Sequence, residues 1–214
     1  MEPDLAPFSA DPAQLTRWNG RYAIDDYLFG TAPNQFLARR RERIVPGMRT
    51  LCVADGEGRN SVWLAQQGCN VTAFDFSPVA VNKARALAAH AHVRVDYHVC
   101  DIFRWSWTRD AYDLIAVIFI QFLAPHERRA IFTRIVESLA PGGLLLLEGY
   151  RPEQLIYKTG GPSQDENLYT EALLREQFAS LDILDLASYD ATVNEGAAHT
   201  GMSALIDLVA RKPG

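Results

Sequence analysis

Hydrophobic residues gather in short continuous runs along the chain, and between these runs they recur every three to four residues. The runs are rich in β-branched and aliphatic side chains, as is typical of strands buried on both faces; they occupy residues 50–54, 70–75, 93–99, 112–119 and 144–150. Strands that alternate with helices need crossover connections, and such connections join parallel neighbours. The pattern therefore predicts a doubly wound α/β sheet.

Four intervening segments are expected to be helical, although the connection 101–110 is short and aromatic, so that any helix there is brief. Residues 59–67 place apolar side chains on a helical period, and Gly68 is suited to end that helix. Ser77 followed by Pro78 is typical of a helix N-terminus. Pro125 opens another helical stretch, which is expected to end at a Pro-Gly-Gly turn.

The last part of the chain has a different pattern. A helix is predicted over about residues 170–178, and strand-like runs follow at 181–193 and 202–212. Because no helical segment separates these runs, they are expected to form an antiparallel hairpin at the sheet edge. The fold class is therefore α/β, with a doubly wound seven-stranded sheet that is mostly parallel and has an antiparallel C-terminal hairpin strand.

A chain of 214 residues with 48% hydrophobic residues suits one domain. The expected parts are an N-terminal helical and aromatic cap, a core, a loop, and a helix with the hairpin, at residues 1–45, 46–150, 151–169 and 170–214. The cap is expected to end in a helix opened by Pro33. The loop is long, polar and rich in Gly and Pro, which predicts a mobile cover over a binding site.

The charge balance argues against nucleic acid as a partner. The formal net charge is -5, whereas proteins that collect phosphates usually display a basic field. Glu42 interrupts the arginines at positions 39–43, and we interpret this cluster as an exposed helix face. A small molecule is the expected partner.

The sequence carries no targeting or membrane signal. Its start is acidic and contains proline, unlike a secretion signal. The most apolar segment, 114–124, is shorter than the roughly 20 residues that cross a bilayer. Cys52, Cys69 and Cys100 lack the spacing of a metal site or disulfide framework. We expect a cytoplasmic protein with reduced cysteines, no metal and no membrane association.

The stretch VADGEGRNSVWLA, residues 53–65, joins the first strand-like run to a helix through a turn that contains Gly56 and Gly58. Such a turn exposes backbone N–H groups at the positive end of the helix, where a polar ligand can bind. Glycine allows close approach and positive φ. By itself, a tight strand-to-helix corner shows the same pattern.

Two carboxylates follow on the next strands. Asp75 ends the second run, where a doubly wound sheet brings a side chain beside the first turn to bind ribose hydroxyls. Asp101 ends the third run and is suited to accept a hydrogen bond from an exocyclic amine such as that of adenine. Each aspartate alone equally suits a helix cap or a solvated turn, but both together favour a ligand that contains a nucleoside.

The motifs LCVADGEGRN, FDFSP, CDIF, YDLIAV and LAPGGLLLLE occur in this order and resemble the class I S-adenosylmethionine-dependent methyltransferases over about residues 45–150. The segments WNGRY, YLFGTAPNQFL, GRN and EGAAHTGMSALIDLVARK resemble, more narrowly, the small bacterial tellurite-resistance and thiopurine methyltransferases. The resemblance implies a Rossmann-like methyltransferase fold, a methyltransferase activity and S-adenosylmethionine as the cofactor.

The chain departs from this family in the first motif. Cys52 stands where an acidic residue is usual, Ala54 replaces the first glycine, and Asp55 replaces a small residue. The resemblance then implies that Asp55 takes over part of the contact to the ammonium group of the cofactor.

The resemblance also implies the remaining cofactor contacts. Ala54, Gly56 and Gly58 would line the methionine part, and Asp75 would hold the ribose. The other expected contacts are Phe76 and Ser77 beside the adenine face, Asp101 and Ile102 at the adenine edge, and Ile118 and Phe119 under the sulfonium.

Methyl transfer is expected to proceed in line to a small-molecule acceptor. Because the cofactor supplies its own electrophile, the protein mainly positions and desolvates the reactants. A soft nucleophile, such as a thiolate or a selenium or tellurium oxyanion, then needs no general base. The acceptor-site candidates are Tyr22, Tyr27, Gln121, His126 and Arg151, although core packing, a strand end, a solvated first turn and a surface cation explain these residues as well.

Two other functions fit parts of the sequence. A nicotinamide-dependent oxidoreductase would share Gly56, Gly58 and Asp75, but Asp101, the LAPGGLLLLE motif and the C-terminal hairpin argue against it. A cofactor-binding sensor without turnover would fit the altered CVAD segment.

Overall fold

The computed structural model describes residues 11–214. These residues form two compact units. The N-terminal unit contains residues 11–106 together with Glu195–Ala198, and the C-terminal unit contains Trp107–Asn194 and His199–Gly214.

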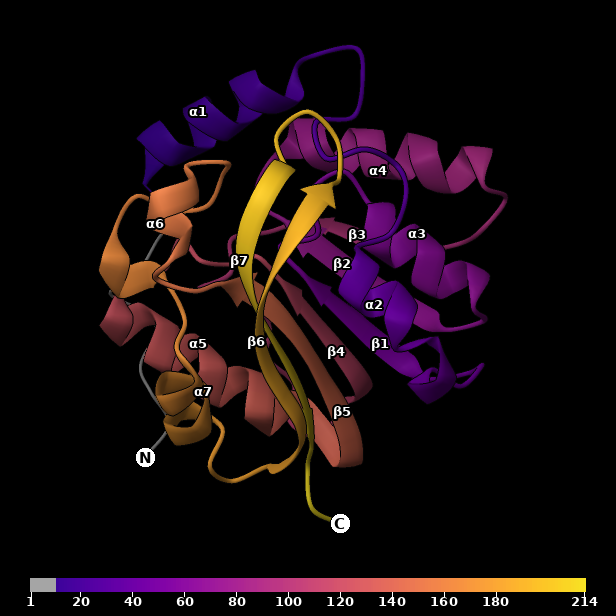
Figure 1. The fold of residues 1–214 in the computed structure, drawn as a ribbon. Helices are drawn as coiled ribbons and strands as arrows, with labels where there is room; N and C mark the ends of the chain where they lie inside the picture. Colours follow the sequence, from indigo (N-terminus) through magenta and orange to yellow (C-terminus); the bar gives the residue numbers. More distant parts are fainter. Residues whose placement is uncertain (1–10) are drawn as a thin grey trace. The chain divides into compact units, whose positions relative to one another are not determined.

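The N-terminal unit consists of three parallel strands with helices (Figure 1). β1 pairs with β2 and β2 pairs with β3, both in parallel. Its helical elements are α1 (Pro12–Tyr22), α2 (Gln35–Arg39), the 3-10 helix η1 (Arg41–Arg43), α3 (Arg59–Gln66) and α4 (Pro78–His90), and its strands are β1 (Arg49–Val53), β2 (Asn70–Asp75) and β3 (Asp96–Val99).

Local signals explain where these helices begin. The Ser77 hydroxyl accepts the Ala80 N–H and caps α4, as the Ser-Pro signal predicts. α1 is a helix that we did not predict, although Asp11 caps it by accepting the Ala13 N–H and proline follows the cap. The helix predicted to open at Pro33 begins two residues later and is short, because Asn34 is its N-cap and it ends at Arg39.

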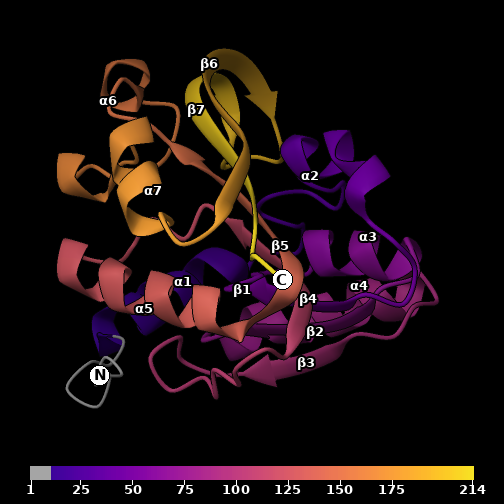
Figure 2. The same ribbon diagram turned by 90° about the horizontal axis from the view of Figure 1, so that it is seen from below.

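The C-terminal unit contains the other four strands. β4 pairs with β5 in parallel, β5 pairs with β7 in antiparallel, and β6 forms the antiparallel hairpin with β7. The elements are β4 (Tyr112–Ile118), α5 (Pro125–Ser138), β5 (Leu139–Tyr150), α6 (Gln154–Tyr157), the 3-10 helix η2 (Asp165–Asn167), α7 (Glu171–Gln177), β6 (Asp182–Asn194) and β7 (Thr200–Arg211). α5 and α7 lie side by side in both ribbon views (Figures 1 and 2). Phe132 of α5 stacks on Phe178, which follows α7, with ring centroids 4.8 Å apart.

The strand order is β3-β2-β1-β4-β5-β7-β6. This topology confirms the predicted seven-stranded α/β sheet, mostly parallel with an antiparallel C-terminal hairpin strand. Two strand boundaries differ from the prediction by three residues or more, and the other strand boundaries differ by at most two residues. β3 begins at Asp96 rather than at position 93, and residues 141–143 lie inside β5 instead of forming a turn before it.

The segment 151–169, expected to be a mobile loop, contains α6 and η2. Gln154 is buried, donates to Thr159 Oγ1 at 3.0 Å and accepts the Ala204 N–H at 2.9 Å. The Thr159 hydroxyl donates to the Met202 carbonyl at 2.5 Å. These bonds tie the first half of the segment to β7, and its mobility stays a prediction.

Within residues 11–214, no helix has the length and apolar character that crossing a bilayer requires. The same residues contain no group of three or more His, Cys, Asp or Glu side chains arranged to hold a metal ion. Their three cysteines are free.

Candidate functional site

The turn after β1 has an unusual backbone. Ala54, Gly56 and Gly58 have φ angles of 48°, 63° and 91°, all in the left-handed region. An L-residue such as Ala54 adopts this conformation at a cost of about 1–2 kcal/mol. The position therefore favours glycine, and alanine keeps the same backbone path with only one added methyl group.

Gly58 has a packing role that the sequence did not reveal. A Cβ atom at this position would lie 2.7 Å from the Ala84 Cβ and 2.9 Å from the Tyr97 hydroxyl. The absence of a side chain therefore lets α3 approach α4. The contact of Gly58 with the methionine part of a cofactor stays a prediction.

Asp75 lies beside the glycine turn, as predicted from its place at the end of β2. Its Oδ2 accepts the Gly56 N–H at 3.0 Å, and its Oδ1 accepts the Ser77 N–H at 2.9 Å. Burial raises the pKa of Asp75 to about 6, and these backbone hydrogen bonds oppose the rise. Each carboxylate oxygen has a further lone pair, so the group fits a ribose hydroxyl as an additional donor.

The structure brings Asp101 to the same end of the neighbouring strands. The register pairs Asp75 with Val99, and the Cys100 N–H donates to the Asp75 carbonyl at 3.0 Å. Asp101 Oδ1 accepts the Phe103 N–H at 3.0 Å, which is the kind of turn contact that this aspartate would also make without a ligand.

The neighbours of these two aspartates differ in exposure. Ile102 is buried, and Phe76 is half-buried. Ser77 caps α4, and its hydroxyl donates to Asn19 Oδ1 at 2.6 Å. Its position beside the adenine stays a prediction.

Asp55 extends toward α3 and β3. The Ser61 hydroxyl donates to Asp55 Oδ2 at 2.5 Å and lies 2.8 Å from the Tyr97 hydroxyl. Burial raises the pKa of Asp55 to about 7. Burial also raises the pKa of the neighbouring Cys52 thiol, so this position carries a neutral group where the family usually has an acid. The contact of Asp55 with the cofactor ammonium stays a prediction.

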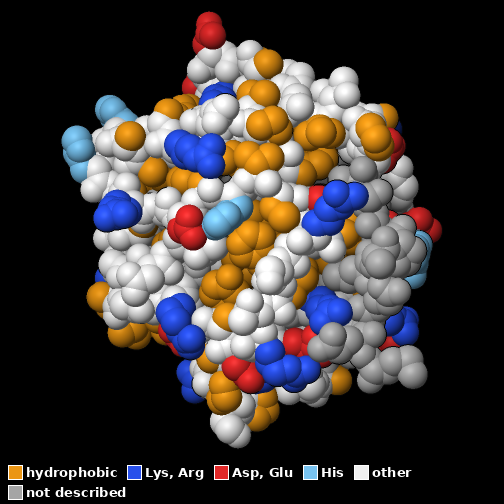
Figure 3. Space-filling model, turned by 180° about the vertical axis from the view of Figure 1, so that it is seen from behind, with side chains coloured by type: hydrophobic (Ala, Val, Ile, Leu, Met, Phe, Trp, Pro, Cys, Tyr) orange, Lys and Arg blue, Asp and Glu red, His pale blue; other side chains and the backbone are white. Residues whose placement is uncertain are grey.

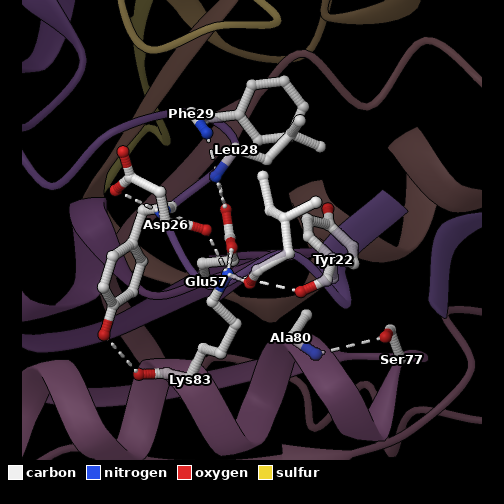
Figure 4. Close-up of polar contacts among 10 residues, drawn as sticks. Tyr22, Asp26, Leu28, Phe29, Glu57, Ser77, Ala80 and Lys83 are labelled. Atoms are coloured by element: carbon white, nitrogen blue, oxygen red, sulfur yellow. Dashed lines mark hydrogen bonds and ion pairs between the residues drawn. The ribbon is translucent and has the colours of Figure 1, made fainter. Parts of the chain in front are cut away.

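Glu57, between the two glycines, holds part of the N-terminal segment. Its carboxylate accepts the N–H of Leu28 at 2.8 Å and that of Phe29 at 3.4 Å, and it lies 2.6 Å from Lys83 Nζ (Figure 4). Only 3% of Glu57 is exposed. A buried glutamate needs such partners, because an isolated buried charge is strongly destabilising.

Lys83 binds the same segment from α4. Its ammonium donates to the carbonyls of Tyr22, Ile24 and Asp26 at 3.3, 3.1 and 2.5 Å (Figure 4). Two of these carbonyls lie at or just beyond the C-terminus of α1, where a cation is favourable. Lys83 and Glu57 therefore fix residues 22–29 against the glycine turn and α4.

Two acceptor-site candidates lie in this segment. Tyr22 is buried and stacks on Trp18 with centroids 5.4 Å apart, and its hydroxyl lies 3.2 Å from where a Cβ on Gly56 would be. The Tyr27 hydroxyl donates to the Lys83 carbonyl at 3.2 Å. Both tyrosines serve packing in this unit, and their contact with an acceptor stays a prediction.

The remaining predicted residues belong to the C-terminal unit. Ile118 ends β4, and Phe119 follows with a φ of 55°. The ring of Phe119 packs on those of Tyr150 and His199, with centroids 4.6 and 4.7 Å apart. Their predicted place under the sulfonium is not tested by these contacts.

Gln121 lies three residues after the end of β4, and its side-chain amide binds two backbone segments. Its Oε1 accepts the Tyr150 N–H at 2.6 Å, and its Nε2 donates to the carbonyls of Tyr150 and Asn167 at 2.8 and 3.0 Å. His126 is exposed on the first turn of α5. Arg151 forms ion pairs with Asp190 and Glu153.

Several structural residues of the site were missed. Glu57 had a signal, because a charged residue between two glycines of a tight turn needs a partner. Lys83, Asn34 and Glu195 had none, because their partners are distant in sequence. On the face seen in Figure 3, side chains of both charges are scattered around a hydrophobic centre.

Residues 51–143 match the family model described as "Methyltransferase domain". Among curated proteins, carboxy-S-adenosyl-L-methionine synthase of Aeromonas salmonicida is 33% identical over 89 residues, which are 39% of this chain and 34% of the relative. The match thus spans about a third of the length of this relative.

Two solved structures share the fold over nearly the whole chain. N-methyltransferase NodS from Bradyrhizobium japonicum WM9, in complex with S-adenosyl-L-homocysteine, has a TM-score of 0.70 and 18% identity, covering 94% of this chain and 98% of NodS. A structure from work on the conversion of a disulfide bond into a thioacetal group during echinomycin biosynthesis has a TM-score of 0.75 and 16% identity, covering 94% and 92%.

The mostly parallel sheet with its antiparallel C-terminal hairpin agrees with this fold. Residues 51–143, less than half of the chain, are similar to the methyltransferase-domain family, and the chain has the Rossmann-like methyltransferase fold that it shares with NodS.

Proposed function

We propose that this protein transfers the methyl group of S-adenosylmethionine to a small, soft nucleophile, such as a thiolate or a selenium or tellurium oxyanion. The observation that carries the proposal is the charge around the glycine turn. Asp75 accepts the Gly56 N–H and, with a pKa of about 6, is mostly ionised at pH 7. This negative charge at the turn is unfavourable for the pyrophosphate of a nicotinamide dinucleotide, whereas S-adenosylmethionine carries a sulfonium and an ammonium beside its single carboxylate.

The residues of the turn fit this cofactor. Ala54 and Gly56 have little or no side chain to obstruct its approach, and Asp75 retains lone pairs for a ribose hydroxyl. When bound, S-adenosylmethionine supplies a methyl group on a positively charged sulfur. The chain then has to position the two reactants and exclude water.

The names of similar proteins support the cofactor and suggest the acceptor class. One relative is a synthase of a carboxylated S-adenosylmethionine, and NodS was solved with S-adenosylhomocysteine. The echinomycin work concerns sulfur atoms of a disulfide. The echinomycin work and the resemblance to tellurite-resistance and thiopurine methyltransferases favour a soft acceptor, whereas the name of NodS, an N-methyltransferase, indicates a nitrogen acceptor for that protein.

The polar acceptor-site candidates also favour a nucleophile that needs no base. Gln121 uses both ends of its amide on backbone groups, and Arg151 is paired with carboxylates. His126 is exposed, and the Tyr27 hydroxyl donates to a carbonyl. A thiolate or a chalcogen oxyanion already carries the electron pair that attacks the methyl carbon.

The proposal includes a cytoplasmic location, and it favours a small molecule over nucleic acid as the substrate. Free cysteines suit a reducing compartment. The mixed charges in Figure 3 and the net charge of -5 do not favour phosphate binding.

A ligand panel tests the cofactor. S-adenosylmethionine and S-adenosylhomocysteine should raise the melting temperature, because a ligand that binds only the folded state stabilises it. NAD and NADP should leave it unchanged. Stabilisation by the nicotinamide compounds alone would contradict the proposal. Methyl transfer to thiols, selenite and tellurite, with small amines as the comparison, then tests the acceptor class and separates an enzyme from a sensor.

Asp75→Asn should weaken S-adenosylhomocysteine binding by about 10- to 150-fold, the range expected for a lost hydrogen bond to a charged group. Asparagine cannot accept two backbone N–H groups and a ribose hydroxyl as a carboxylate does. Isothermal titration calorimetry measures the effect. Methyl transfer should fall with binding.

Asp96→Asn, at an exposed position on β3, is the matched control and should bind as the wild type does. Asp55→Asn should weaken binding less than Asp75→Asn, because the Asp55 side chain contacts Ser61 in α3. The reverse order would mean that Asp55, rather than Asp75, is the main cofactor contact.

A further inference from the structure

The connection between β6 and β7 carries a buried carboxylate that binds three groups of the N-terminal unit. Glu195 lies 2.7 Å from Arg59 Nη2, and 6% and 7% of the two side chains are exposed. Glu195 also accepts the Gln35 N–H at 2.9 Å and lies 3.3 and 3.4 Å from Asn34 Nδ2. Residues 195–198 belong to this unit, although they are distant from its other residues in sequence.

The buried guanidinium of Arg59 forms an ion pair with the Glu195 carboxylate. Arg59 is the first residue of α3 and directly follows Gly58. Its Nη1 is buried and has no hydrogen-bond partner among residues 11–214. Glu195 is therefore the acid at hydrogen-bond distance that compensates a guanidinium buried next to the glycine turn. Removing one partner of such a pair leaves a buried charge without compensation.

Asn34 extends the same contact to α2 and α3. Its Oδ1 accepts the Leu37 N–H at 3.2 Å and caps α2. Its own N–H donates to Asn60 Oδ1 at 2.9 Å. The segment 28–35 is therefore fixed at both ends. Glu57 binds its first residues, 28 and 29, and Glu195 and Asn60 bind its last residues, 34 and 35.

The backbones of the connection and the segment cross without space for a side chain. A Cβ on Gly196 would lie 2.4 Å from the Gly30 nitrogen, and Gly196 has a φ of 74°. The Ala198 N–H donates to the Leu28 carbonyl at 3.2 Å. The two segments are thus in direct backbone contact, and neither can shift far alone.

We infer that Glu195 is a positioning residue for the cofactor. Glu195 holds Arg59 and the segment 28–35 in place. This segment in turn binds Glu57 of the glycine turn through the N–H groups of Leu28 and Phe29, and Asn60 of α3 through the N–H group of Asn34. The cofactor leaves when the connection 195–198 and the segment 28–35 open together. This inference rests on the proposed function, because it assigns the cofactor to the glycine turn.

Glu195→Gln keeps the shape of the side chain and removes its charge. S-adenosylhomocysteine should dissociate faster from this variant, and its dissociation constant should rise by about 5- to 150-fold, the usual range of coupling between linked sites. With saturating cofactor, kcat should change little. This substitution should therefore raise the KM for the cofactor while kcat stays nearly the same. A substitution that only lowers overall stability would not produce this pattern.

Glu42→Gln is the matched control, since Glu42 is an exposed glutamate of the same unit that pairs with the adjacent Arg43. It should bind and release S-adenosylhomocysteine as the wild type does. Equal dissociation rates for Glu195→Gln and the wild type, both folded, would overturn the inference. Failure of the wild type to bind S-adenosylhomocysteine would instead refute the proposed function.

Hydrogen exchange on the wild type tests the inference even if Glu195→Gln does not fold. Amides of residues 28–35 and 195–198 should exchange at one common rate, and S-adenosylhomocysteine should slow both segments together. Exchange of the two segments at independent rates, or protection of neither by S-adenosylhomocysteine, would overturn it.

Discussion

Gly58→Ala is expected to destabilise the protein by about 3 kcal/mol, within a range of about 2–5 kcal/mol. The new methyl group would lie 2.7 Å from the Ala84 Cβ and 2.8 Å from the Ala84 Cα, which belong to a packed helix and cannot move separately. Overpacking of this kind costs about 1–3 kcal/mol. The φ of 91° adds about 1–2 kcal/mol for a residue with a side chain.

Chemical or thermal unfolding measures this effect, and the melting temperature should fall by about 6–12 °C for a chain of this size. Two glycines provide matched controls. Gly142 has a φ of 76° and no atom within 4 Å of the point where a Cβ would lie, so Gly142→Ala should cost only the backbone strain, about 1–2 kcal/mol. Gly20 lies in α1 with open space around it, and Gly20→Ala should stabilise by up to about 1 kcal/mol. Equal losses at Gly58 and Gly142 would contradict the packing role.

Asp55→Asn is expected to change how stability depends on pH. The pKa of Asp55 is raised from 3.8 to about 7 by burial, so the folded state binds its proton more tightly than the unfolded state. The stability linked to this proton is present below about pH 4 and is lost as the pH rises to about 7. The total is about 4 kcal/mol, from 1.36 kcal/mol per pKa unit.

The wild type should therefore lose about 3 kcal/mol relative to Asp55→Asn between pH 5 and pH 8. Unfolding by urea at both pH values measures this difference. Asparagine can still accept the Ser61 hydroxyl, and it carries no charge to desolvate. Asp25→Asn, at an exposed position, is the control and should follow the wild type at both pH values. A parallel pH dependence in Asp55→Asn and the wild type would show that Asp55 is not the titrating group.

The order of strands and helices was predictable because its signals are local. Ser77 caps α4 through an atom three residues away, and the hydrophobic runs coincide with β1, β2, β4 and the hairpin. The positions of Asp75 and Asp101 follow from the same pattern, since the ends of adjacent parallel strands lie together. The arrangement of β1, β2 and α4 was thus accessible from the local sequence pattern.

The roles of side chains within the turn were not predictable in this way. A side chain at position 58 would clash with Ala84 and Tyr97, which are distant in sequence. The Asp55 carboxylate accepts a hydrogen bond from Ser61, which the sequence pattern did not indicate. The boundaries of β3 and β5 also differ from the hydrophobic runs, because hydrogen bonds with the neighbouring strand determine where pairing begins.

The sequence by itself determined the α/β class, the hairpin and the carboxylate at the end of β2, because hydrophobic periodicity and capping act between residues close in the chain. Only the tertiary structure decided that Glu195 compensates Arg59, that Lys83 binds the end of α1 and that Gln121 binds backbone groups. These contacts join residues that are far apart in sequence. A buried charge or amide must find a partner, and local sequence preferences do not specify which distant group the fold brings within hydrogen-bond distance.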